Sequence, residues 1–194
     1  MTIAYQIGNK LYLNVTNRCT NDCDFCIRRG KTGIEGHNLW LEKEPQYEEV
    51  IKAIGDPTPY EEIVFVGFGE PLYRIDLVKE VARWIKAHGV PVRVDTNGQA
   101  NLIHGRNVVP ELKGLLDTIS ISLNATSAKE YDRLCHSVYG EDAYDAMLNF
   151  AKEAKKYIPR VILSVVDYGG VDLEKARKIA EEMGVEFRVR EYIE

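Results

Sequence analysis

Short runs of β-branched and aromatic residues alternate with helix-like segments along the whole of this 194-residue chain. Six runs predict strands, over residues 11–16, 62–67, 91–97, 118–124, 160–167 and 186–192. Helical patterns separate them, over residues 45–54, 75–88, 109–116, 142–157 and 173–183, with a shorter one at 128–136. Parallel strands need crossover helices and are buried on both faces, so the pattern predicts one parallel sheet of six βα units.

The length and composition fit a single domain. With 45% of its residues apolar, the chain is long enough for one sizeable core but short for two, so residues 1–194 are expected to form one domain. The first residues lack the pattern of a signal peptide, and no apolar run approaches the roughly 18 residues that span a bilayer. The sequence therefore predicts a soluble, cytoplasmic protein without a membrane partner.

The charge balance is mildly acidic, with 25 Lys and Arg residues against 30 Asp and Glu residues and a net charge of −5. This balance disfavours the broad basic surface used for nucleic acid, although it does not exclude a nucleic-acid substrate. One local basic patch, Arg28, Arg29 and Lys31, follows the cysteines. It is placed either to meet an anionic substrate or to form a solvated loop end.

Three cysteines lie within eight residues, in the stretch Cys19-Thr-Asn-Asp-Cys23-Asp-Phe25-Cys26. Three thiolates from one loop can bind at one point and leave a further coordination position for a ligand that is not protein. Such clustering in an intracellular chain indicates metal binding rather than disulfides. The alternative is a structural zinc site, which needs a fourth ligand such as Cys135, but a lone cysteine in a helical pattern is more typical of a small buried hydrophobe.

A second motif, Gly67-Phe-Gly69-Glu70-Pro71, ends the second predicted strand. Taken alone it is a tight turn. Together with the Cys-x-x-x-Cys-x-x-Cys loop and the aromatic residue before its last cysteine, it resembles the radical S-adenosylmethionine (radical SAM) superfamily. The resemblance implies that Cys19, Cys23 and Cys26 hold a [4Fe-4S] cluster, whose fourth iron takes the amino and carboxylate groups of S-adenosylmethionine (SAM).

Periodicity alone leaves two architectures open, a doubly wound sheet and a partial barrel. The resemblance favours the second, a single-domain α/β fold of the (β/α)6 partial TIM barrel type. In both, ligands bind at the carboxyl ends of the strands. The two motifs obey that rule, because the cysteines follow the first predicted strand and the glycine motif ends the second.

The resemblance also implies which residues hold the SAM amino group. The segment from Gly67 to Pro71 contacts it, and the absence of side chains at the two glycines lets a ligand approach the backbone. The third strand ends in Asp95-Thr-Asn97-Gly, which resembles the corresponding segment of glycyl-radical-enzyme activating enzymes. Asp95 is expected to help hold the amino group, with Asn97 beside it.

The remaining SAM contacts implied by the resemblance lie on later strands and in the cysteine loop. Ser122 and Asn124 end the fourth strand, where the superfamily binds the ribose hydroxyls and methionine carboxylate; their alternative role is to cap the following helix. Ser164 and Val165 on the fifth strand, with Val165 as the expected contact, lie where family members touch adenine. Phe25 is expected to pack beside adenine or to anchor the loop.

Substrate-side residues are predicted from polar segments that the cofactor motifs do not use. The segment 99–107 extends the third strand's loop and offers Asn101, His104 and Arg106. His37, in the long loop after the cysteines, and Arg190, near the end of the last strand, complete the set. Each has a structural alternative, because single histidines and arginines are often only hydrogen-bonded or solvated.

The implied activity is reductive cleavage of SAM to a 5′-deoxyadenosyl radical that abstracts hydrogen from a substrate. An electron donor such as flavodoxin or ferredoxin is the implied partner. The opening segment 1–19 and the segment 101–106 resemble small TatD-associated radical SAM proteins, which implies a functional link to a TatD-type hydrolase but no substrate. Three alternatives stay open: an activating enzyme for a partner protein, a noncatalytic iron-sulfur redox module and a tRNA-modifying enzyme.

Overall fold

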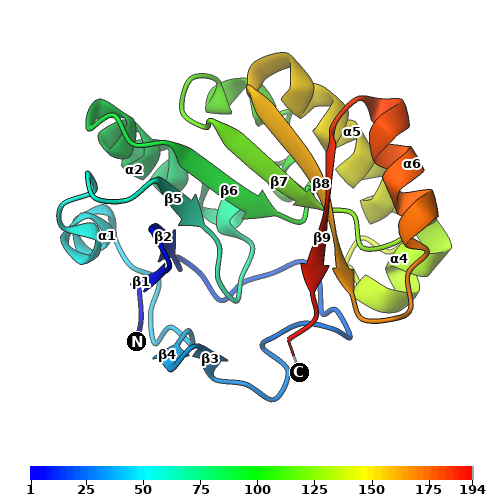
Figure 1. The fold of residues 1–194 in the computed structure, drawn as a ribbon, viewed down its shortest axis with the longest axis horizontal. Helices are drawn as coiled ribbons and strands as arrows, with labels where there is room; N and C mark the ends of the chain where they lie inside the picture. Colours follow the sequence, from blue (N-terminus) through cyan, green and yellow to red (C-terminus); the bar gives the residue numbers. More distant parts are fainter. Residues whose placement is uncertain (194) are drawn as a thin grey trace.

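The computed structural model describes residues 1–193 and has a mixed α/β fold built on a seven-stranded sheet (Figure 1). Six strands are parallel and lie side by side in chain order. They are β2 (Lys10–Leu13), β5 (Glu62–Phe65), β6 (Val92–Thr96), β7 (Thr118–Ser122), β8 (Arg160–Asp167) and β9 (Glu186–Glu191). All six predicted strands are present, most of them shorter by one to three residues at an end. An unpredicted strand, β1 (Ala4–Ile7), pairs antiparallel with β2 at one edge.

Most helices match the prediction to within two residues. They are α1 (Tyr47–Ile54), α2 (Ile75–Ala87), α4 (Ala128–Cys135), α5 (Asp142–Tyr157) and α6 (Leu173–Met183). Side-chain caps explain two of the starts, because the Ser127 hydroxyl and the Asp172 carboxylate accept from backbone N–H groups of α4 and α6. No helix within residues 1–193 combines the length and apolar character needed to cross a bilayer.

The predicted helix at 109–116 is wrong in length and type. Only a four-residue 3₁₀ turn forms there, η2 (Val109–Leu112). Gly114 follows in the left-handed region with φ of +75°, which ends the helical path. Two further short elements were not predicted, η1 (Pro71–Arg74) after the glycine motif and α3 (Ala100–His104) after β6.

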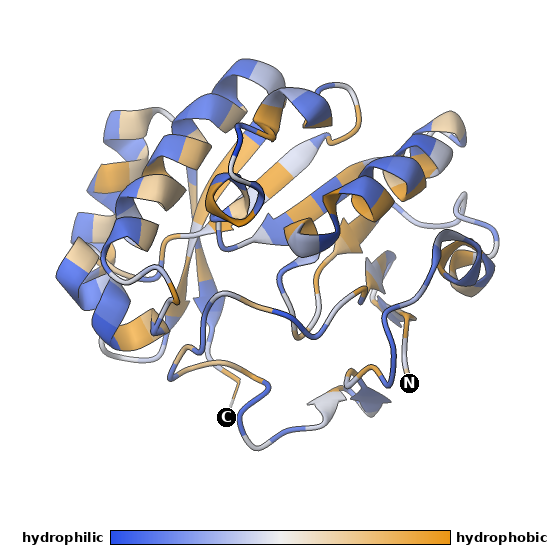
Figure 2. Ribbon diagram, turned by 180° about the vertical axis from the view of Figure 1, so that it is seen from behind, coloured by the Kyte–Doolittle hydropathy of each residue, from blue (hydrophilic) through white to orange (hydrophobic). Residues whose placement is uncertain are grey.

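The sheet has two chemically different faces. Apolar side chains from alternate positions pack under the helices and are fully buried; they include Ile63, Val92, Val94, Ile119, Ile121 and Leu163. In Figure 2 the helices change between hydrophilic and hydrophobic colours along their length, as amphipathic helices over such a face should. The intervening positions form what we call the polar face: Glu62, Arg93, Asp95, Ser120, Ser122, Ser164, Arg188 and Arg190. Arg93, Ser120 and Ser164 on this face are buried, in agreement with strands buried on both faces, but the face is polar rather than apolar.

A long segment, residues 14–46, connects β2 to α1 and carries the cysteines. In Figure 1 its blue part runs from β2 across to the side where β8 and β9 end, and it returns to a small hairpin, β3 (Gly33–Ile34) and β4 (His37–Asn38). Its far part is fixed to the end of α4, because the N–H of Asp22 donates to the Cys135 carbonyl at 2.9 Å. The loop is thus held at both β2 and α4.

Candidate functional site

The three clustered cysteines are partly buried in the segment between β2 and α1. Two N–H groups approach the sulfur of Cys19: the backbone N–H of Asn21 at 3.4 Å and the side-chain amide of Asn97 at 3.8 Å. Burial raises the pKa of the Cys19 thiol to about 12, and the nearby Glu70 carboxylate adds to this. Burial therefore disfavours the thiolate form of Cys19 in the protein alone, and a bound cation would favour it.

The arginines after the cysteines hold the loop rather than project from it. Arg28 donates to the carbonyl of Asn21 at 2.9 Å, and Arg29 donates to the carbonyl of Cys23 at 2.9 Å and to that of Asp22 at 2.8 Å. These bonds satisfy loop carbonyls that no regular structure uses. Arg29 is exposed, in agreement with a solvated loop end, and both arginines also hold the loop through its carbonyls.

Cys135, which the sequence left without a role, lies against Cys23. It is fully buried, and its thiol hydrogen-bonds to the Cys23 sulfur. That bond lowers the pKa of Cys23, while burial acts in the opposite direction. The expectation of a small buried residue is confirmed, but its contact with the cysteine loop was not foreseen.

The two glycines of the glycine motif bring the start of the cysteine loop close to the end of β5. A Cβ on Gly67, whose φ is +140°, would lie 2.2 Å from the side-chain oxygen of Asn14. A Cβ on Gly69 would lie 2.3 Å from the carbonyl oxygen of Thr16. The atoms that need these glycines thus belong to the protein itself, and Glu70 N donates to the Arg18 carbonyl at 2.7 Å at the same junction.

Glu70 is a buried carboxylate with three donors. It accepts from Leu72 N at 2.9 Å, from the Thr96 hydroxyl at 2.8 Å and from Asn97 N at 2.7 Å, and is 2% exposed. Burial raises its pKa to about 7, although the three donors oppose this. Glu70 therefore joins the end of β5 to the end of β6, with Pro71 buried at the start of η1.

A buried polar network behind the cysteines was missed by the sequence analysis. The Asn97 amide donates to the Thr20 hydroxyl at 2.8 Å. Gln99, with no exposed surface, donates to the Asn21 side chain at 2.8 Å and to the Tyr131 hydroxyl at 2.9 Å. The network therefore joins the cysteine loop, the end of β6 and α4 through buried hydrogen bonds.

On the polar face, Asp95 and Ser122 have partners within the protein. The guanidinium of Arg93 is ion-paired with Asp95 at 2.9 Å and with Glu62 at 2.9 Å. Arg190 reaches across from β9 and donates to the Ser122 hydroxyl at 3.2 Å. The structure thus brings Ser122 together with one substrate-side candidate.

Asn124 and Val165 both have structural contacts. Asn124 takes a positive φ of +53°, which asparagine tolerates, and its side-chain oxygen accepts from Val166 N at 3.1 Å. The Val165 side chain is fully buried in the core with the apolar face, so only its backbone is available to a ligand. Its neighbour Ser164 lies on the polar face and is also buried.

Phe25 stacks on Tyr168, the residue after β8, with ring centroids 5.0 Å apart and planes 17° from parallel. The contact fixes the last part of the cysteine loop over the carboxyl end of β8. Tyr168 also borders an open hollow of about 740 Å³ between the ends of β8 and β9. Phe25 therefore anchors the loop at the edge where the hollow opens, and sequence reasoning did not identify its partner.

The other substrate-side candidates lie apart from one another. His104 bonds to the Leu72 carbonyl at 2.7 Å, and Arg106 is ion-paired with Glu111 at 2.9 Å. Asn101 accepts from Val108 N at 2.8 Å, within its own loop. His37 lies in the small hairpin against the Tyr5 ring. None of these contacts joins them to the polar face or to Arg190.

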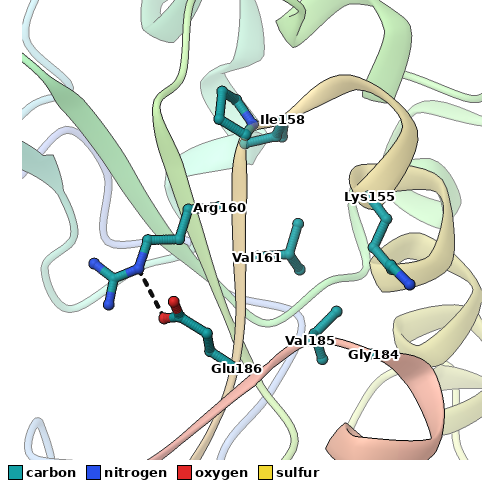
Figure 3. Close-up of a pocket in the computed structure, with 8 residues that line it drawn as sticks. Lys155, Ile158, Arg160, Val161, Gly184, Val185 and Glu186 are labelled. Carbon is teal, nitrogen blue, oxygen red and sulfur yellow. Dashed lines mark hydrogen bonds and ion pairs between the residues drawn. The ribbon is translucent and has the colours of Figure 1, made fainter.

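Another hollow, of about 190 Å³, lies at the opposite edge of the sheet. Figure 3 shows Arg160 at the start of β8 and Glu186 at the start of β9 pointing toward each other, joined by a 2.7 Å ion pair. These are the amino ends of the strands, away from the cysteines. In parallel α/β sheets ligands bind at the carboxyl ends, so we do not assign this hollow to the site.

The cysteine loop suits an iron-sulfur cluster on two grounds. Its donor set is three thiols from one short segment, and N–H groups already point at the Cys19 sulfur, as they do around cluster thiolates. Within residues 1–193, no three His, Cys, Asp or Glu side chains converge closely enough for a single metal ion. A cubane cluster spaces its ligands more widely than one ion does, so the two observations are compatible.

The chain is an α/β protein with a loop of three clustered thiols at the carboxyl edge of a parallel sheet. A family model for the radical SAM superfamily matches residues 13–183, which is most of the chain. The chain therefore belongs to the radical SAM superfamily. Members of this superfamily are generally enzymes and bind SAM and a [4Fe-4S] cluster.

Two curated relatives match at low identity. An uncharacterised protein of Methanocaldococcus jannaschii is 29% identical over 163 residues, and a probable GTP 3′,8-cyclase of Thermococcus kodakarensis is 26% identical over 162 residues. Each match covers 84% of this chain, but only 49% and 48% of the relatives. The chain thus spans about half the length of the curated relatives it matches.

Solved structures agree with the fold. Streptococcus suis SuiB, bound to its precursor peptide SuiA, superposes with a TM-score of 0.69 at 15% identity, over 98% of this chain and 40% of SuiB. The protein anSMEcpe with bound AdoMet gives a TM-score of 0.66 at 14% identity, over 94% of this chain and 51% of that protein. At such identities the likeness shows the fold alone.

Proposed function

We propose that the protein is a radical SAM enzyme that holds a [4Fe-4S] cluster on Cys19, Cys23 and Cys26. When bound, the cluster and SAM supply reductive cleavage of SAM to a 5′-deoxyadenosyl radical, which takes a hydrogen atom from the substrate. The observation that carries the proposal is the docking of the cysteine loop on the glycine motif. Gly69 packs on the Thr16 carbonyl and Glu70 N donates to the Arg18 carbonyl, which supports a single site built from both motifs.

The chain's own residues would position the ligands and exclude water. Arg28 and Arg29 hold the loop carbonyls, and the hydrogen bonds of Asn21 with Gln99 and Tyr131 fix the loop from behind. Glu70 Oε2 accepts a hydrogen bond from Asn97 N, and a carboxylate oxygen can accept a second. That spare capacity, beside Asp95 on the next strand, supports a role in holding the SAM ammonium group.

For the architecture we propose a (β/α)6 partial barrel formed as one radical SAM core domain. Strand order supports this, because the six parallel strands follow chain order without the reversal that a doubly wound sheet has. The division into one polar and one helix-covered face supports it as well, since a curved sheet can enclose its ligands on the polar side. Residues of both edges share one hydrophobic core cluster.

The electron donor and setting follow from the same chemistry. A flavodoxin or ferredoxin of the cytoplasm is the proposed reductant, since such carriers supply single electrons at low potential. Within the superfamily we propose the TatD-associated group, on the resemblance of segments 1–19 and 101–106. The substrate is not specified by these features.

The proposal is tested by anaerobic cluster reconstitution followed by electron paramagnetic resonance of the reduced protein with and without SAM. The same sample is assayed for 5′-deoxyadenosine. A spectrum altered by SAM together with 5′-deoxyadenosine is the expected result. A cluster that forms but does not respond to SAM would replace the enzyme with a noncatalytic redox module. The matched control is Cys135→Ala, which keeps all three proposed ligands, against Cys26→Ala, which removes one.

A further inference from the structure

Two arginines on the last strand have guanidinium groups that the protein does not satisfy. Arg188 and Arg190 lie two residues apart on β9, beside Ser164 and Val166 of β8, so both project from the polar face. The Nε atom of each is buried without a hydrogen-bond partner. Arg188 has no hydrogen-bond or ion-pair partner within residues 1–193, and Arg190 has only the Ser122 hydroxyl.

The acidic groups of the polar face are already paired elsewhere. Glu62 is shared by Lys10 at 3.0 Å and Arg93 at 2.9 Å, and Asp95 pairs with Arg93. At the amino end of β9, Glu186 is balanced by Arg160. Lys10, Arg93, Arg188 and Arg190 therefore face only two carboxylates, which leaves an excess of two positive charges.

This arrangement is costly for the protein alone. Burial lowers the pKa of the Arg190 guanidinium. The nearby Asp95 carboxylate, which is itself ion-paired with Arg93, opposes this shift, whereas the charges of Arg188 and Arg93 act in the same direction as burial. Buried charged groups without partners destabilise a fold, and one opposite charge relieves both desolvation and repulsion. A guanidinium pair offers planar forks of donors, which match the oxygens of a carboxylate or phosphate group.

The arginine pair, Arg188 and Arg190, lies at the proposed reaction site. Arg190 contacts Ser122 near the carboxyl end of β7, and the Cys23 sulfur is close enough to affect its charge. Hydroxyls of Ser120, Ser122 and Ser164 lie on the same face and can complete hydrogen bonding to a bound oxyanion. A ligand held there lies between the sheet and the cysteine loop.

We propose that Arg188 and Arg190 bind an oxyanion group of the substrate, a carboxylate or a phosphate ester. The identification of the ligand as substrate rests on the proposed radical SAM function. The anion site itself rests on the excess of positive charge on the polar face and on the buried Nε atoms of the two arginines, which lack hydrogen-bond partners. The substrate class is therefore anionic and small enough to reach β9 from the carboxyl edge of the sheet.

The test titrates inorganic phosphate, and separately succinate, into the reconstituted full chain under anaerobic conditions. Binding is measured by calorimetry at constant ionic strength. The variants are Arg188→Gln and Arg190→Gln. The control is Arg160→Gln, an exposed arginine at the other end of β8. We expect saturable binding that weakens about tenfold or more in each β9 variant, as loss of a charge-assisted hydrogen bond predicts, and is unchanged in the control.

Each outcome decides the proposal. Tighter binding of phosphate supports a phosphate ester, and tighter binding of succinate supports a carboxylate. Absence of saturable binding to the wild type, or equal binding to Arg188→Gln, overturns it. If Arg190→Gln fails to fold, Arg188→Gln still decides, because Arg188 has no hydrogen bond or ion pair to lose within residues 1–193.

A competition experiment separates substrate from cofactor. Phosphate or succinate that binds unchanged in the presence of saturating SAM supports a substrate group, whereas displacement by SAM shows that the pair holds the cofactor's own carboxylate and overturns the proposal. Anion binding does not need SAM cleavage. A protein that binds anions but forms no 5′-deoxyadenosine would therefore refute the proposed function and leave the anion site standing.

Discussion

Replacement of Glu70 by glutamine changes a buried acceptor into an amide without altering its shape. The Glu70 carboxylate accepts from Leu72 N and Thr96 Oγ1 on one oxygen and from Asn97 N on the other. If the glutamine oxygen keeps the first two bonds, its NH2 group faces the N–H of Asn97. An unpaired buried N–H costs about 1–3 kcal/mol, so we take about 2 kcal/mol for this term.

Titration of Glu70 favours the Glu70→Gln variant as pH rises, which is opposite in sign to the cost of the unpaired N–H. Burial raises the Glu70 pKa from 4.5 to about 7, so the folded state binds more protons than the unfolded state between these values. The stability linked to this proton is fully present below pH 4.5 and is lost as pH rises through about 7. The shift corresponds to about 3 kcal/mol, and Glu70→Gln lacks it because glutamine does not titrate.

The two terms together predict that the stability curves cross. Glu70→Gln should be about 2 kcal/mol less stable than wild type near pH 4.5 and about 1 kcal/mol more stable near pH 8. Urea unfolding of metal-free protein with reduced thiols, measured across this range, gives the difference curve. A difference that is constant with pH, or that grows in favour of wild type as pH rises, would mean that the three donors hold Glu70 ionised and would refute the reasoning.

Three further substitutions probe the cysteine loop and its support. Gly69→Ala places a Cβ 2.3 Å from the Thr16 carbonyl, so the loop must shift; we expect a melting temperature lower by about 5 °C and less iron bound after reconstitution. Cys135→Ala removes the bond that lowers the pKa of Cys23, so the ultraviolet thiolate absorbance of metal-free protein should titrate at higher pH; an unchanged titration contradicts the contact. Tyr131→Phe leaves two buried amide donors without their shared acceptor and should destabilise the protein by about 2 kcal/mol in urea unfolding. Tyr157→Phe should not, because the Tyr157 hydroxyl makes no hydrogen bond within residues 1–193.

The repeating elements were accessible from the sequence because they depend on local periodicity. Helix α5 and strand β8 match their predicted bounds, and each is long and strongly patterned. The polar face had a readable signal that was not used. Strand β6 reads Val-Arg-Val-Asp-Thr and strand β7 reads Thr-Ile-Ser-Ile-Ser, a two-residue alternation that indicates one polar face.

The support behind the cysteines had no such signal. Gln99 meets Asn21 across 78 positions of sequence, and Asn21 meets Tyr131 across 110. Cys135 is brought to Cys23 only because α4 ends beneath the loop. Contacts of this kind follow from tertiary packing, and no pattern of neighbouring residues indicates them.

The same limit explains the substrate-side candidates. Asn101 and His104 have side chains suited to substrate binding, but their short helix packs beside η1, and their polar atoms form hydrogen bonds there. Arg190 was selected on the same grounds and does face Ser122. The sequence gives no corresponding indication for its neighbour Arg188, because an isolated arginine in a strand does not reveal whether an acidic partner lies nearby.

The division of the sheet into two faces separates two kinds of evolutionary freedom. Residues such as Val94 and Ile121 are fully buried in the hydrophobic core, whereas Asp95 and Ser122, one position further along, lie on the polar face. Saturation mutagenesis of the strands should therefore show tolerance with a period of two residues. A scaffold with this property can acquire a new specificity through changes at alternate positions while its thermodynamic stability is conserved.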